Sequence, residues 1–500
     1  MKHIWNSAKL ISLLTLGSRL LGLARDILCA AIFGLSWMWD AFLLAWTLPN
    51  LFRRLFGEGA ITSALLPLFQ KKHQEHPKKG QQLVNLALSY MLSLLAKILF
   101  LLYLVVFAIL LCGQLKEKYF YTILLLLILL PYLPLICLSA ASGAILNALD
   151  HFLIPAFLPL FLNLFWIGGI LSALWLVPEK SAQLLTIAFF LLAGGAGQLA
   201  LSMWGLKKMN ISWRWKNYTN SPEIEELRKK MFPVLLSGSV LQLNTMLDRV
   251  IAEAFVPGNG GVSALYFGNR MVQFPLAMIG IAIATAVFPS LSKSAQQKSP
   301  KQFQSLLTSA LKMTSFIALP AAIGLFVLAS PIIQALFERG AFLSHSTTRT
   351  AKVLAYYAPS VYFFCLIHVF SKAYYAQGDV RTPVKISLAM VGLNLCLNLI
   401  LVLLLQESGL ALSTSLTSCL HFLLLYLYSP HSISLWGPLL RQATIAALMG
   451  GILLALKQNL PIPIIWAVLT YVLAGVGVYF SLARIFLPKE WKELLSSFQK

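Results

Sequence analysis

Long apolar stretches separated by short polar segments run through the whole 500-residue chain. A membrane-crossing helix needs about 20 mainly apolar residues. Fourteen stretches satisfy this: 8–34, 37–56, 83–112, 120–142, 154–177, 183–206, 231–252, 262–290, 307–329, 350–371, 384–405, 409–428, 437–457 and 461–486. We therefore predict an all-α polytopic membrane protein with fourteen transmembrane helices.

The first stretch resembles a secretory signal peptide because a short polar N-terminus precedes an apolar run. No A-x-A-like cleavage site follows it, and Arg19 interrupts the apolar core. We interpret it as an uncleaved first transmembrane helix.

Composition agrees with a membrane protein. The chain is 58% hydrophobic and 11% charged, with a mean hydropathy of +0.78, whereas about a quarter of the residues in a soluble domain are charged. The six cysteines all lie in apolar segments without a C-x-x-C pair, so we expect them to pack rather than to bind metal or form disulfides. They are Cys29, Cys112, Cys137, Cys365, Cys396 and Cys419.

The net charge of +22 raises the question of a nucleic-acid partner, and its distribution answers it. With a cytoplasmic N-terminus, 26 of the 39 Lys and Arg residues fall on inside segments, 7 fall on outside segments, and 6 fall within spans. This asymmetry is the positive-inside rule, so we place both termini in the cytoplasm. It leaves no basic patch that requires a nucleic acid.

The chain contains an internal repeat. A shift of 222 residues brings Asp26 onto Asp248 and "AITSALLPLFQK" (60–71) onto "AIATAVFPSLSK" (282–293). A weaker match follows at a shift of 228, where Cys137 meets Cys365. The shift carries the first helix onto the seventh, so each repeat holds six helices. Because six is even, the halves share one orientation, which is the parallel-repeat plan of alternating-access carriers.

Charged residues inside the first span share one face. At 100° per residue, Arg19, Arg25 and Asp26 fall with small residues on an arc about 120° wide. An Arg at a helix centre costs roughly 2.5–3.5 kcal/mol unless it faces protein or water. Arg25 and Asp26 could neutralise neighbouring residues in a packed bundle, but two cations against one anion leave a positive charge. We favour an anion-binding site.

Further charges lie near the ends of neighbouring spans. Asp40 opens the second span, and the motif "PNLFRRLFGEGA" at its end carries Arg53, Arg54 and Glu58. In the second half, Asp248 lies in the seventh span and Arg270 in the eighth. We expect a cavity between the halves to present Arg19, Arg25 and Arg270 together.

Guanidinium groups in a low-dielectric cavity suit a phosphate or diphosphate, because the planar fork binds it bidentately and stays charged. A cationic drug would require carboxylates there instead. The exposed apolar helices suit a substrate that also carries a lipid tail.

At these motifs the sequence resembles a known family. The segments "SRLLGLARDILCAAIFG", "DAFLLAWTLPNLFRRLFGEGAITSALLP", "FGNRMVQFPLAMIGIAIATAVFPSLSK" and "RTPVKISLAMVGLNLCLNLILV" are similar to the MurJ (MviN) lipid II flippases of the multidrug/oligosaccharidyl-lipid/polysaccharide (MOP) exporter superfamily. The resemblance covers nearly the whole chain.

The resemblance implies two six-helix lobes around a cationic cavity, which we place at 1–216 and 217–430, and a C-terminal helix pair in 431–500 that forms a groove for the lipid tail. It implies transport of the undecaprenyl-diphosphate-linked peptidoglycan precursor lipid II from the cytoplasmic to the outer leaflet of the bacterial inner membrane. Arg19, Arg25 and Arg270 would contact the substrate, with Asp26 and Asp40 beside them. Arg53, Arg54 and Glu58 would act in gating.

Two positions depart from the family pattern. Many members have a Lys where this chain has Thr47, and an acidic residue where it has Gln273. These differences leave the anion site intact but put gating ion pairs at those positions in doubt.

Some members of this family bind sodium. Asp248, Asn394, Asn398 and Thr414 could supply the oxygen ligands, although Asn in membrane helices also serves interhelical hydrogen bonding. We expect no other cofactor. Lipid II and membrane lipids are the expected partners of a monomer that associates with cell-wall synthesis proteins.

Three alternatives stay open. The chain could be another exporter of the same superfamily, acting on drugs or on a different polysaccharide-linked lipid. It could be a membrane enzyme, although no loop is long enough for a catalytic domain. It could be a scaffold for cell-wall synthesis, which would not need arginines within its spans.

Overall fold

The computed structural model describes residues 2–113, 115–219, 221–429, 436–457, 463–488 and 491, and every regular element in these ranges is helical. The chain divides into two compact units, Met1–Met246 and Leu247–Lys500. The division falls inside the helix α9 (Pro222–Phe255). We placed the lobe boundary before this helix, at 216/217, and that scheme of lobes stays a prediction.

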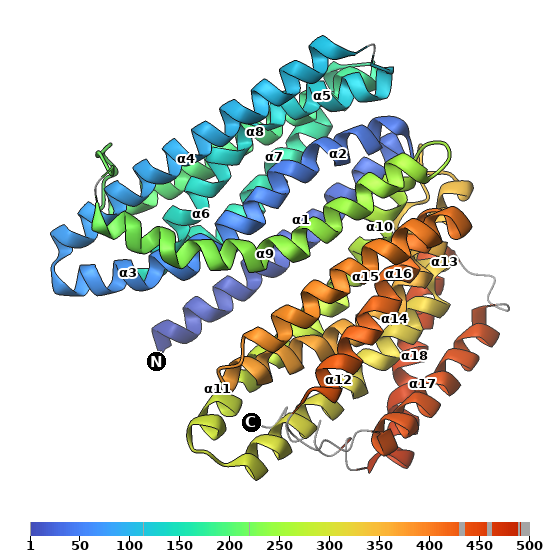
Figure 1. Cartoon of the computed structure of the whole chain (residues 1–500). Coiled ribbons are helices and arrows are strands. Elements are labelled where there is room, and N and C mark those ends of the chain that lie inside the picture. Colours follow the sequence, from blue (N-terminus) through green and yellow to red (C-terminus); the bar gives the residue numbers. More distant parts are fainter. Residues whose placement is uncertain are drawn as a thin grey trace. The chain divides into compact units, whose positions relative to one another are not determined.

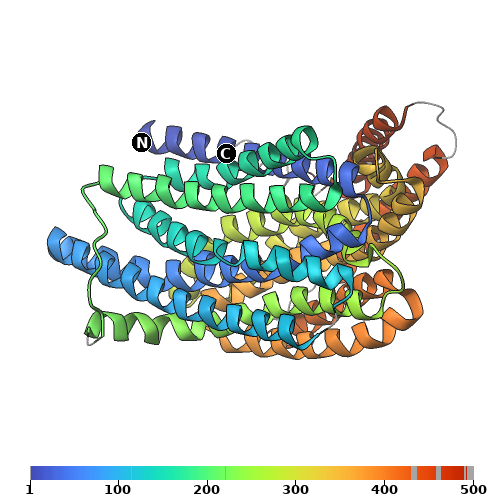
Figure 2. The same cartoon turned by 90° about the horizontal axis from the view of Figure 1, so that it is seen from above.

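Unit 1 is a bundle of long helices that run side by side (Figures 1 and 2). Helix α7 packs against α1, α6 and α8, and α5 packs against α2 and α8. The elements before α9 are α1 (Lys2–Phe33), α2 (Trp37–Phe52), the π-helix η1 (Arg53–Ala60), α3 (Ile61–Glu75), α4 (Pro77–Cys112), α5 (Glu117–Leu129), α6 (Tyr132–Ala148), α7 (Leu153–Leu176) and α8 (Lys180–Lys208).

Unit 2 is organised around one central helix, α14, which packs against α10, α11, α12, α13 and α16. Helix α17 packs against α12 and α18. After α9 the elements are α10 (Gly261–Pro275), the π-helix η2 (Leu276–Ile281), α11 (Ala282–Gln296), α12 (Pro300–Val327), α13 (Ala329–Phe337), α14 (Ser344–Ala376), α15 (Arg381–Leu405), α16 (Glu407–Leu427), α17 (Trp436–Lys457) and α18 (Ile464–Phe486).

The repeat seen in the sequence recurs in the helix boundaries. A shift of 222 carries α1 onto 224–255, and α9 is Pro222–Phe255. The same shift carries η1 onto 275–282, where η2 occupies Leu276–Ile281. The shift of 228 carries α7 onto 381–404, and α15 is Arg381–Leu405. Even the π-helical segments, which are rare, therefore occur at equivalent positions in both halves.

The structure confirms a multi-span membrane protein. Eleven helical segments of the described residues are long and apolar enough to cross a membrane. They coincide with the predicted stretches other than 8–34, 37–56 and 231–252, which fold as α1, α2 with η1, and α9. These three segments carry charged residues in or beside their apolar runs. The total of fourteen spans stays a prediction.

Apolar side chains cover the outside of the helices as well as the cores. On α4, large hydrophobic residues such as Phe100, Leu101 and Leu104 are exposed, as expected for a surface that faces lipid. Inside unit 1, Trp39 stacks with Phe33 and with Phe42. In unit 2, Phe316 and Tyr479 belong to a core that α12 shares with α17 and α18.

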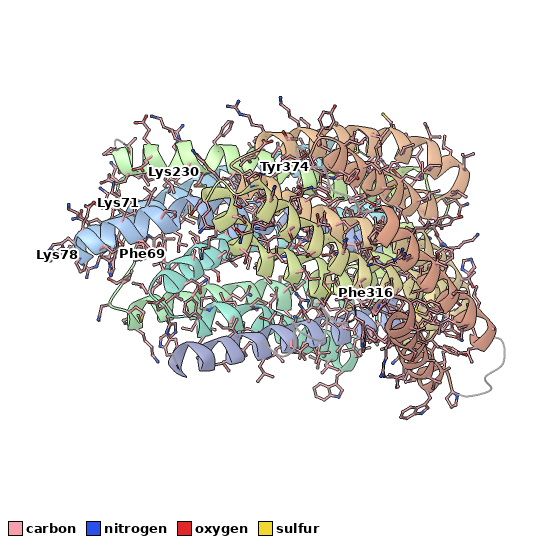
Figure 3. All side chains as sticks on the ribbon, turned by 90° about the horizontal axis from the view of Figure 1, so that it is seen from below. Phe69, Lys71, Lys78, Lys230, Phe316 and Tyr374 are labelled. Atoms are coloured by element: carbon pink, nitrogen blue, oxygen red, sulfur yellow. The ribbon has the colours of Figure 1, made fainter. Side chains whose placement is uncertain are left out.

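Basic residues gather at one end of unit 1. Lys71, Lys78 and Lys230 come from α3, α4 and α9 and lie at the same end of the bundle (Figure 3). Lys72 also forms an ion pair with Glu223 at 3.5 Å. This is the end that the charge distribution assigns to the cytoplasm.

An extended segment at 211–219, which we call the strap, joins α8 to α9 and lies along α4. Side chains four residues apart on α4 bind it. Gln81 exchanges two hydrogen bonds with the Ser212 backbone. Further along, the Arg214 N–H donates to Asn85 Oδ1 (3.0 Å), the Lys216 N–H donates to Ser89 Oγ (3.1 Å), and the Tyr218 hydroxyl donates to Ser93 Oγ. In a sheet, the backbone N–H and C=O groups of such a segment would bind a neighbouring strand. Here, polar side chains on one face of α4 bind backbone groups of the strap instead.

Candidate functional site

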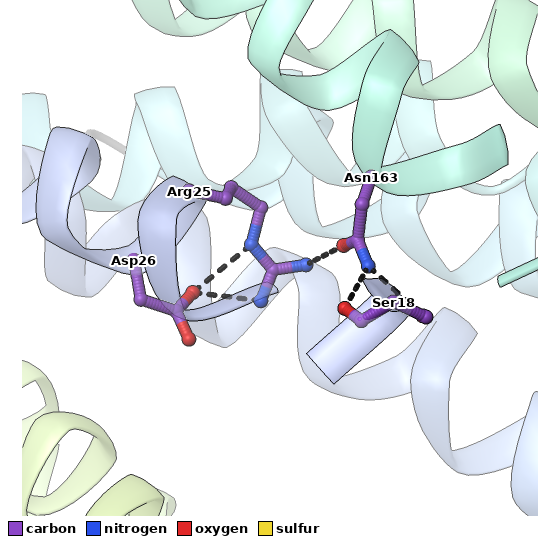
Figure 4. Close-up of polar contacts among 4 residues, drawn as sticks. All are labelled: Ser18, Arg25, Asp26 and Asn163. Carbon is purple, nitrogen blue, oxygen red and sulfur yellow. Dashed lines mark hydrogen bonds and ion pairs between the residues drawn. The ribbon is translucent and has the colours of Figure 1, made fainter. Parts of the chain in front are cut away.

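The polar face of α1 packs against α7 in the middle of unit 1. The Arg25 guanidinium donates from Nε (3.0 Å) and from one terminal nitrogen (2.7 Å) to Oδ1 of Asp26. Its other terminal nitrogen donates to Asn163 Oδ1 at 3.1 Å (Figure 4). Asn163 Nδ2 in turn donates to the carbonyl oxygen (2.9 Å) and the hydroxyl (3.3 Å) of Ser18.

An aromatic ring covers one face of the Arg25 guanidinium. The Arg25 Cζ atom lies 4.0 Å from the centre of the Trp166 ring. Trp166 follows Asn163 by three residues on α7, so both side chains project from the same side of that helix. A cation–π contact of this kind contributes about 2 kcal/mol where water is excluded.

These contacts explain how the packed face of α1 accommodates Arg25 and Asp26. Arg25 is 9% exposed and Asp26 is 1% exposed. The carboxylate neutralises the guanidinium, and Asn163 and Trp166 replace part of its hydration. The contacts compensate for the several kcal/mol that an isolated charge costs when it is buried away from water. Arg25 is therefore built into the packing of unit 1.

Arg19 has a different environment. Its side chain is exposed on α1, and within the described ranges no hydrogen bond or ion pair involves it. Arg270 is half-buried on α10, in the other unit. The convergence of Arg19, Arg25 and Arg270 on one cavity stays a prediction.

Asp40 is buried at the start of α2, where Lys118 Nζ of α5 lies 3.4 Å from its carboxylate. Because the first turn of a helix favours a negative charge, Asp40 stabilises α2 and ties it to α5. The structure therefore gives a structural partner to a residue that we assigned to the substrate.

The gating motif coincides with the π-helix η1. The Arg53 Nε donates to Asn50 Oδ1 (3.2 Å), and a terminal nitrogen of Arg54 donates to Gln242 Oε1 of α9 (3.2 Å). Glu58 also lies in η1, but its side chain is outside the described part of the structure. Thr47 occupies the position where many family members have a Lys. Its hydroxyl donates to the Leu43 carbonyl of its own helix.

Three of the four residues predicted to bind sodium, Asp248, Asn394 and Asn398, are brought together in unit 2. Asn398 Nδ2 donates to Asp248 Oδ1 (2.6 Å) and to Asn394 Oδ1 (3.0 Å). Thr414 directs its hydroxyl to the Leu410 carbonyl. The Asn398 Oδ1 oxygen is buried and accepts no hydrogen bond within the described residues. A carboxylate beside an unsatisfied amide oxygen suits an alkali cation, because such ions prefer oxygen ligands.

Three contact residues were missed by the sequence analysis. Asn163 and Trp166 lie in an apolar stretch, and nothing in that stretch indicates that they face Arg25. The available signal was Asn163 itself, a polar side chain in the middle of a predicted span. Lys118 lies in the polar segment between the predicted spans 83–112 and 120–142, and nothing in the sequence pairs it with Asp40.

Comparison with known proteins gives consistent matches. The family model described as "Lipid II flippase MurJ" matches residues 29–477. The "Probable lipid II flippase MurJ" of Vibrio cholerae is 33% identical over 443 residues, which cover 85% of this chain and 82% of that protein. The "Lipid II flippase MurJ" of Burkholderia cenocepacia is 32% identical over 437 residues, which cover 85% and 83%.

Solved structures show the same fold. A lipid II flippase MurJ in an inward closed conformation superposes with a TM-score of 0.83 at 27% identity, and the match covers 97% of this chain and 99% of that one. An inward-facing MATE family transporter of the MOP superfamily superposes with a TM-score of 0.69 at 12% identity over 82% and 94%. The second match supports the fold alone.

Proposed function

Because the chain belongs to the lipid II flippase MurJ family, we propose that it moves lipid II from the cytoplasmic to the outer leaflet of the bacterial inner membrane. The observation that carries this proposal is the family match over residues 29–477, together with relatives above 30% identity that are covered over most of their length. The multi-span helical fold fits a substrate whose lipid tail stays in the membrane.

The mechanism that we propose is alternating access between the two units. Arg19, exposed on α1, binds the diphosphate when the headgroup enters from the cytoplasm, and Arg270 of the other unit binds it as well. Guanidinium groups suit this role because they remain charged and because each can bind two phosphate oxygens at once. The tail remains in lipid while the units move and release the headgroup outside.

We propose that Arg25 supports this step from within unit 1. Its guanidinium is held by Asp26, Asn163 and Trp166. Its contacts with Asn163 and Trp166 keep α1 fixed against α7.

We further propose that sodium binds beside Asp248, with Asn394, Asn398 and Thr414 as its neighbours. The buried Asn398 Oδ1 and the Asp248 carboxylate fit such an ion. When bound, the cation would supply a positive charge that neutralises Asp248. Lipid II binding to the protein in vesicles, measured in sodium salt and again with choline in place of sodium, tests this proposal. Equal binding in both salts would contradict it.

The charge distribution supports an orientation with both termini in the cytoplasm. We propose that the protein acts as a monomer, possesses no catalytic activity, and associates with cell-wall synthesis proteins that supply or consume its substrate. Chemical labelling of single cysteines placed near residue 79 and near residue 116 tests the orientation, because only the second should react from outside intact cells.

Another exporter of the MOP superfamily is the second candidate, because the MATE transporter shares the fold. The two candidates differ in the charge that the site binds. The exposed Arg19 and the half-buried Arg270 favour an anionic substrate, whereas an exporter of cationic drugs would need carboxylates in their place.

The direct test uses purified protein in lipid vesicles that contain fluorescent lipid II. We expect the headgroup to become accessible on the far leaflet only in vesicles with protein. A lipid with the same tail and a single phosphate without sugars is the specificity control, and we expect slower movement of it. Equal rates with and without protein, or transport of an organic cation instead of lipid II, would contradict the proposal.

A further inference from the structure

Asn163 connects two turns of α1. Its amide nitrogen binds Ser18, and its amide oxygen binds Arg25, which lies seven residues further along the helix. Residues seven apart lie on the same face of an α-helix, so one side chain of α7 bridges the stretch of α1 that contains both arginines (Figure 4). Asn163 is 8% exposed and packs in the interior of unit 1.

The bond to Ser18 bears directly on Arg19. The Ser18 carbonyl belongs to the peptide group that joins Ser18 to Arg19. The hydrogen bond from Asn163 Nδ2 to that oxygen, 2.9 Å long, therefore holds the peptide plane from which the Arg19 side chain departs. Ser18 is half-buried on the packed side of α1, whereas Arg19 is exposed.

Trp166 completes the arrangement and is itself fixed. Its ring packs edge-on against that of Trp46 and at a tilt against that of Phe42, both on α2, with ring centres 5.3 Å and 5.7 Å apart. The Arg25 guanidinium lies over the Trp166 ring. Asn163 and Trp166 thus hold the Arg25 guanidinium in a position that is fixed by contacts among α1, α2 and α7.

Unit 2 contains a related connection. By the repeat, α9 corresponds to α1 and α15 corresponds to α7. There too an Asn of the later helix, Asn398, binds a charged residue of the earlier one, Asp248. The same pair of helices is therefore joined by a buried amide in both halves, although the two asparagines occupy different turns.

We propose that Asn163 and Trp166 are positioning residues for transport: they hold Arg25 and the Ser18–Arg19 peptide so that Arg19 is presented at the exposed side of α1. The inference rests on the proposed function, because it assigns Arg19 to the substrate. Under it, Asp26 serves to hold Arg25 and need not contact the substrate. An anionic side chain on α7 should then be able to replace it.

The first experiment removes the connection. Asn163→Leu keeps the side-chain size and eliminates the bonds to Ser18 and Arg25. We expect lipid II transport to fall at least tenfold and deuterium uptake at residues 18–25 to rise. Asn147→Leu is the matched control, because Asn147 is exposed on α6 and its side chain forms no hydrogen bond within the described residues. It should leave both readouts unchanged.

The second experiment moves the carboxylate from α1 to α7. Asp26→Asn and Asn163→Asp should each lower transport at least tenfold. The first removes the charged partner of Arg25, and the second adds a second carboxylate and removes the amide donor to Ser18. The double variant Asp26→Asn/Asn163→Asp restores one carboxylate beside the same guanidinium. Like Asn163→Asp, it lacks the amide donor to Ser18. We therefore expect transport at least threefold above that of Asn163→Asp but below the wild-type level, with exchange lowered near residue 25 and still raised near residue 18.

The possible results separate a failure of the positioning role from a failure of the proposed function. A double variant no more active than Asn163→Asp, which has also lost the donor to Ser18, would overturn the positioning role, provided that the two melting temperatures match, because Asp26 would then be needed in its own place. Unchanged exchange in Asn163→Leu would overturn it as well. The exchange measurement needs no substrate, so a wild type that fails to move lipid II would instead count against the proposed function.

Discussion

Arg19 and Arg25 lie on the same helix, and the sequence assigned both to one anion site, yet the structure places them in different environments. Arg25 is packed against Asp26, Asn163 and Trp166, whereas Arg19 is exposed. The helical angle alone could not separate them, because which part of the polar arc is covered depends on where α7 packs. For Arg25 the contacts match the alternative of structural pairing in a packed bundle, and its ionic partner is the adjacent Asp26.

The two arginines should respond differently to substitution. Arg19→Ala should lower lipid II transport at least tenfold while the melting temperature in detergent stays unchanged, because the side chain is exposed. Arg19→Lys should retain part of the activity, since the charge remains without the bidentate fork.

Arg25→Ala should lower the stability itself. Removing the guanidinium leaves the buried Asp26 carboxylate without this partner, which costs about 3–5 kcal/mol when an ion pair is well buried. Thermal unfolding followed by fluorescence in detergent provides the comparison. An Arg25→Ala protein as stable as the wild type would contradict the packing that we describe.

At the scale of elements, hydropathy predicted where the helices lie but not how they deviate from regularity. The stretches 154–177 and 384–405 coincide closely with α7 and α15, because a long apolar run in a membrane can satisfy its backbone only as a helix. The π-helices η1 and η2 were not predicted. Each follows a proline within the preceding helix, Pro49 and Pro275, and local packing decides how the backbone adjusts there.

The strap was also not predicted, since its bonds join residues more than 120 positions apart. Polar side chains at 81, 85, 89 and 93 do recur every fourth residue on α4, which places them on one face. The pattern could have indicated a polar contact along that face. It could not have indicated that the partner is the extended chain between α8 and α9.

The strap gives a prediction about proteolysis. Trypsin can cleave after Arg214 and Lys216. The strap should be a poor substrate for it, because the backbone N–H groups of these two residues are bound to side chains of α4. Asn85→Ala and Ser89→Ala should therefore increase cleavage within the strap several-fold. Gln82→Ala is the control, because Gln82 is exposed next to the polar stripe. Equal cleavage in all these proteins would contradict the docking of the strap.

The start of α15 gives a prediction about pH. The Thr382 N–H donates to Asp379 Oδ1 at 3.0 Å, and hydrogen bonds from Thr382 lower the pKa of Asp379 below its usual value of 3.8. A lowered pKa means that the folded state favours the carboxylate, so the stabilisation is present at neutral pH and is lost as the pH falls through the folded-state pKa. Asp379→Ala should lower the melting temperature at pH 7, and the difference should shrink in strong acid. A constant difference would contradict this.

At the scale of the whole molecule, the repeat was the most informative feature of the sequence. It was visible in a few identical positions, and the structure extends it to the bounds of α9, η2 and α15. Duplication also makes the charged residues of the two halves comparable, since Asp26 and Asp248 are equivalent. The partners of these residues differ between the halves, which only the packing of each unit could reveal.

The central claim is that guanidinium groups from both halves bind one diphosphate, and a double-mutant cycle tests it most directly. The measurement is lipid II binding to purified wild type, Arg19→Ala, Arg270→Ala and the double variant. If both side chains bind the same group, the effects should be non-additive by at least about 0.5 kcal/mol, as for residues that share a partner. Additive losses, or full affinity in either single variant, would contradict the account.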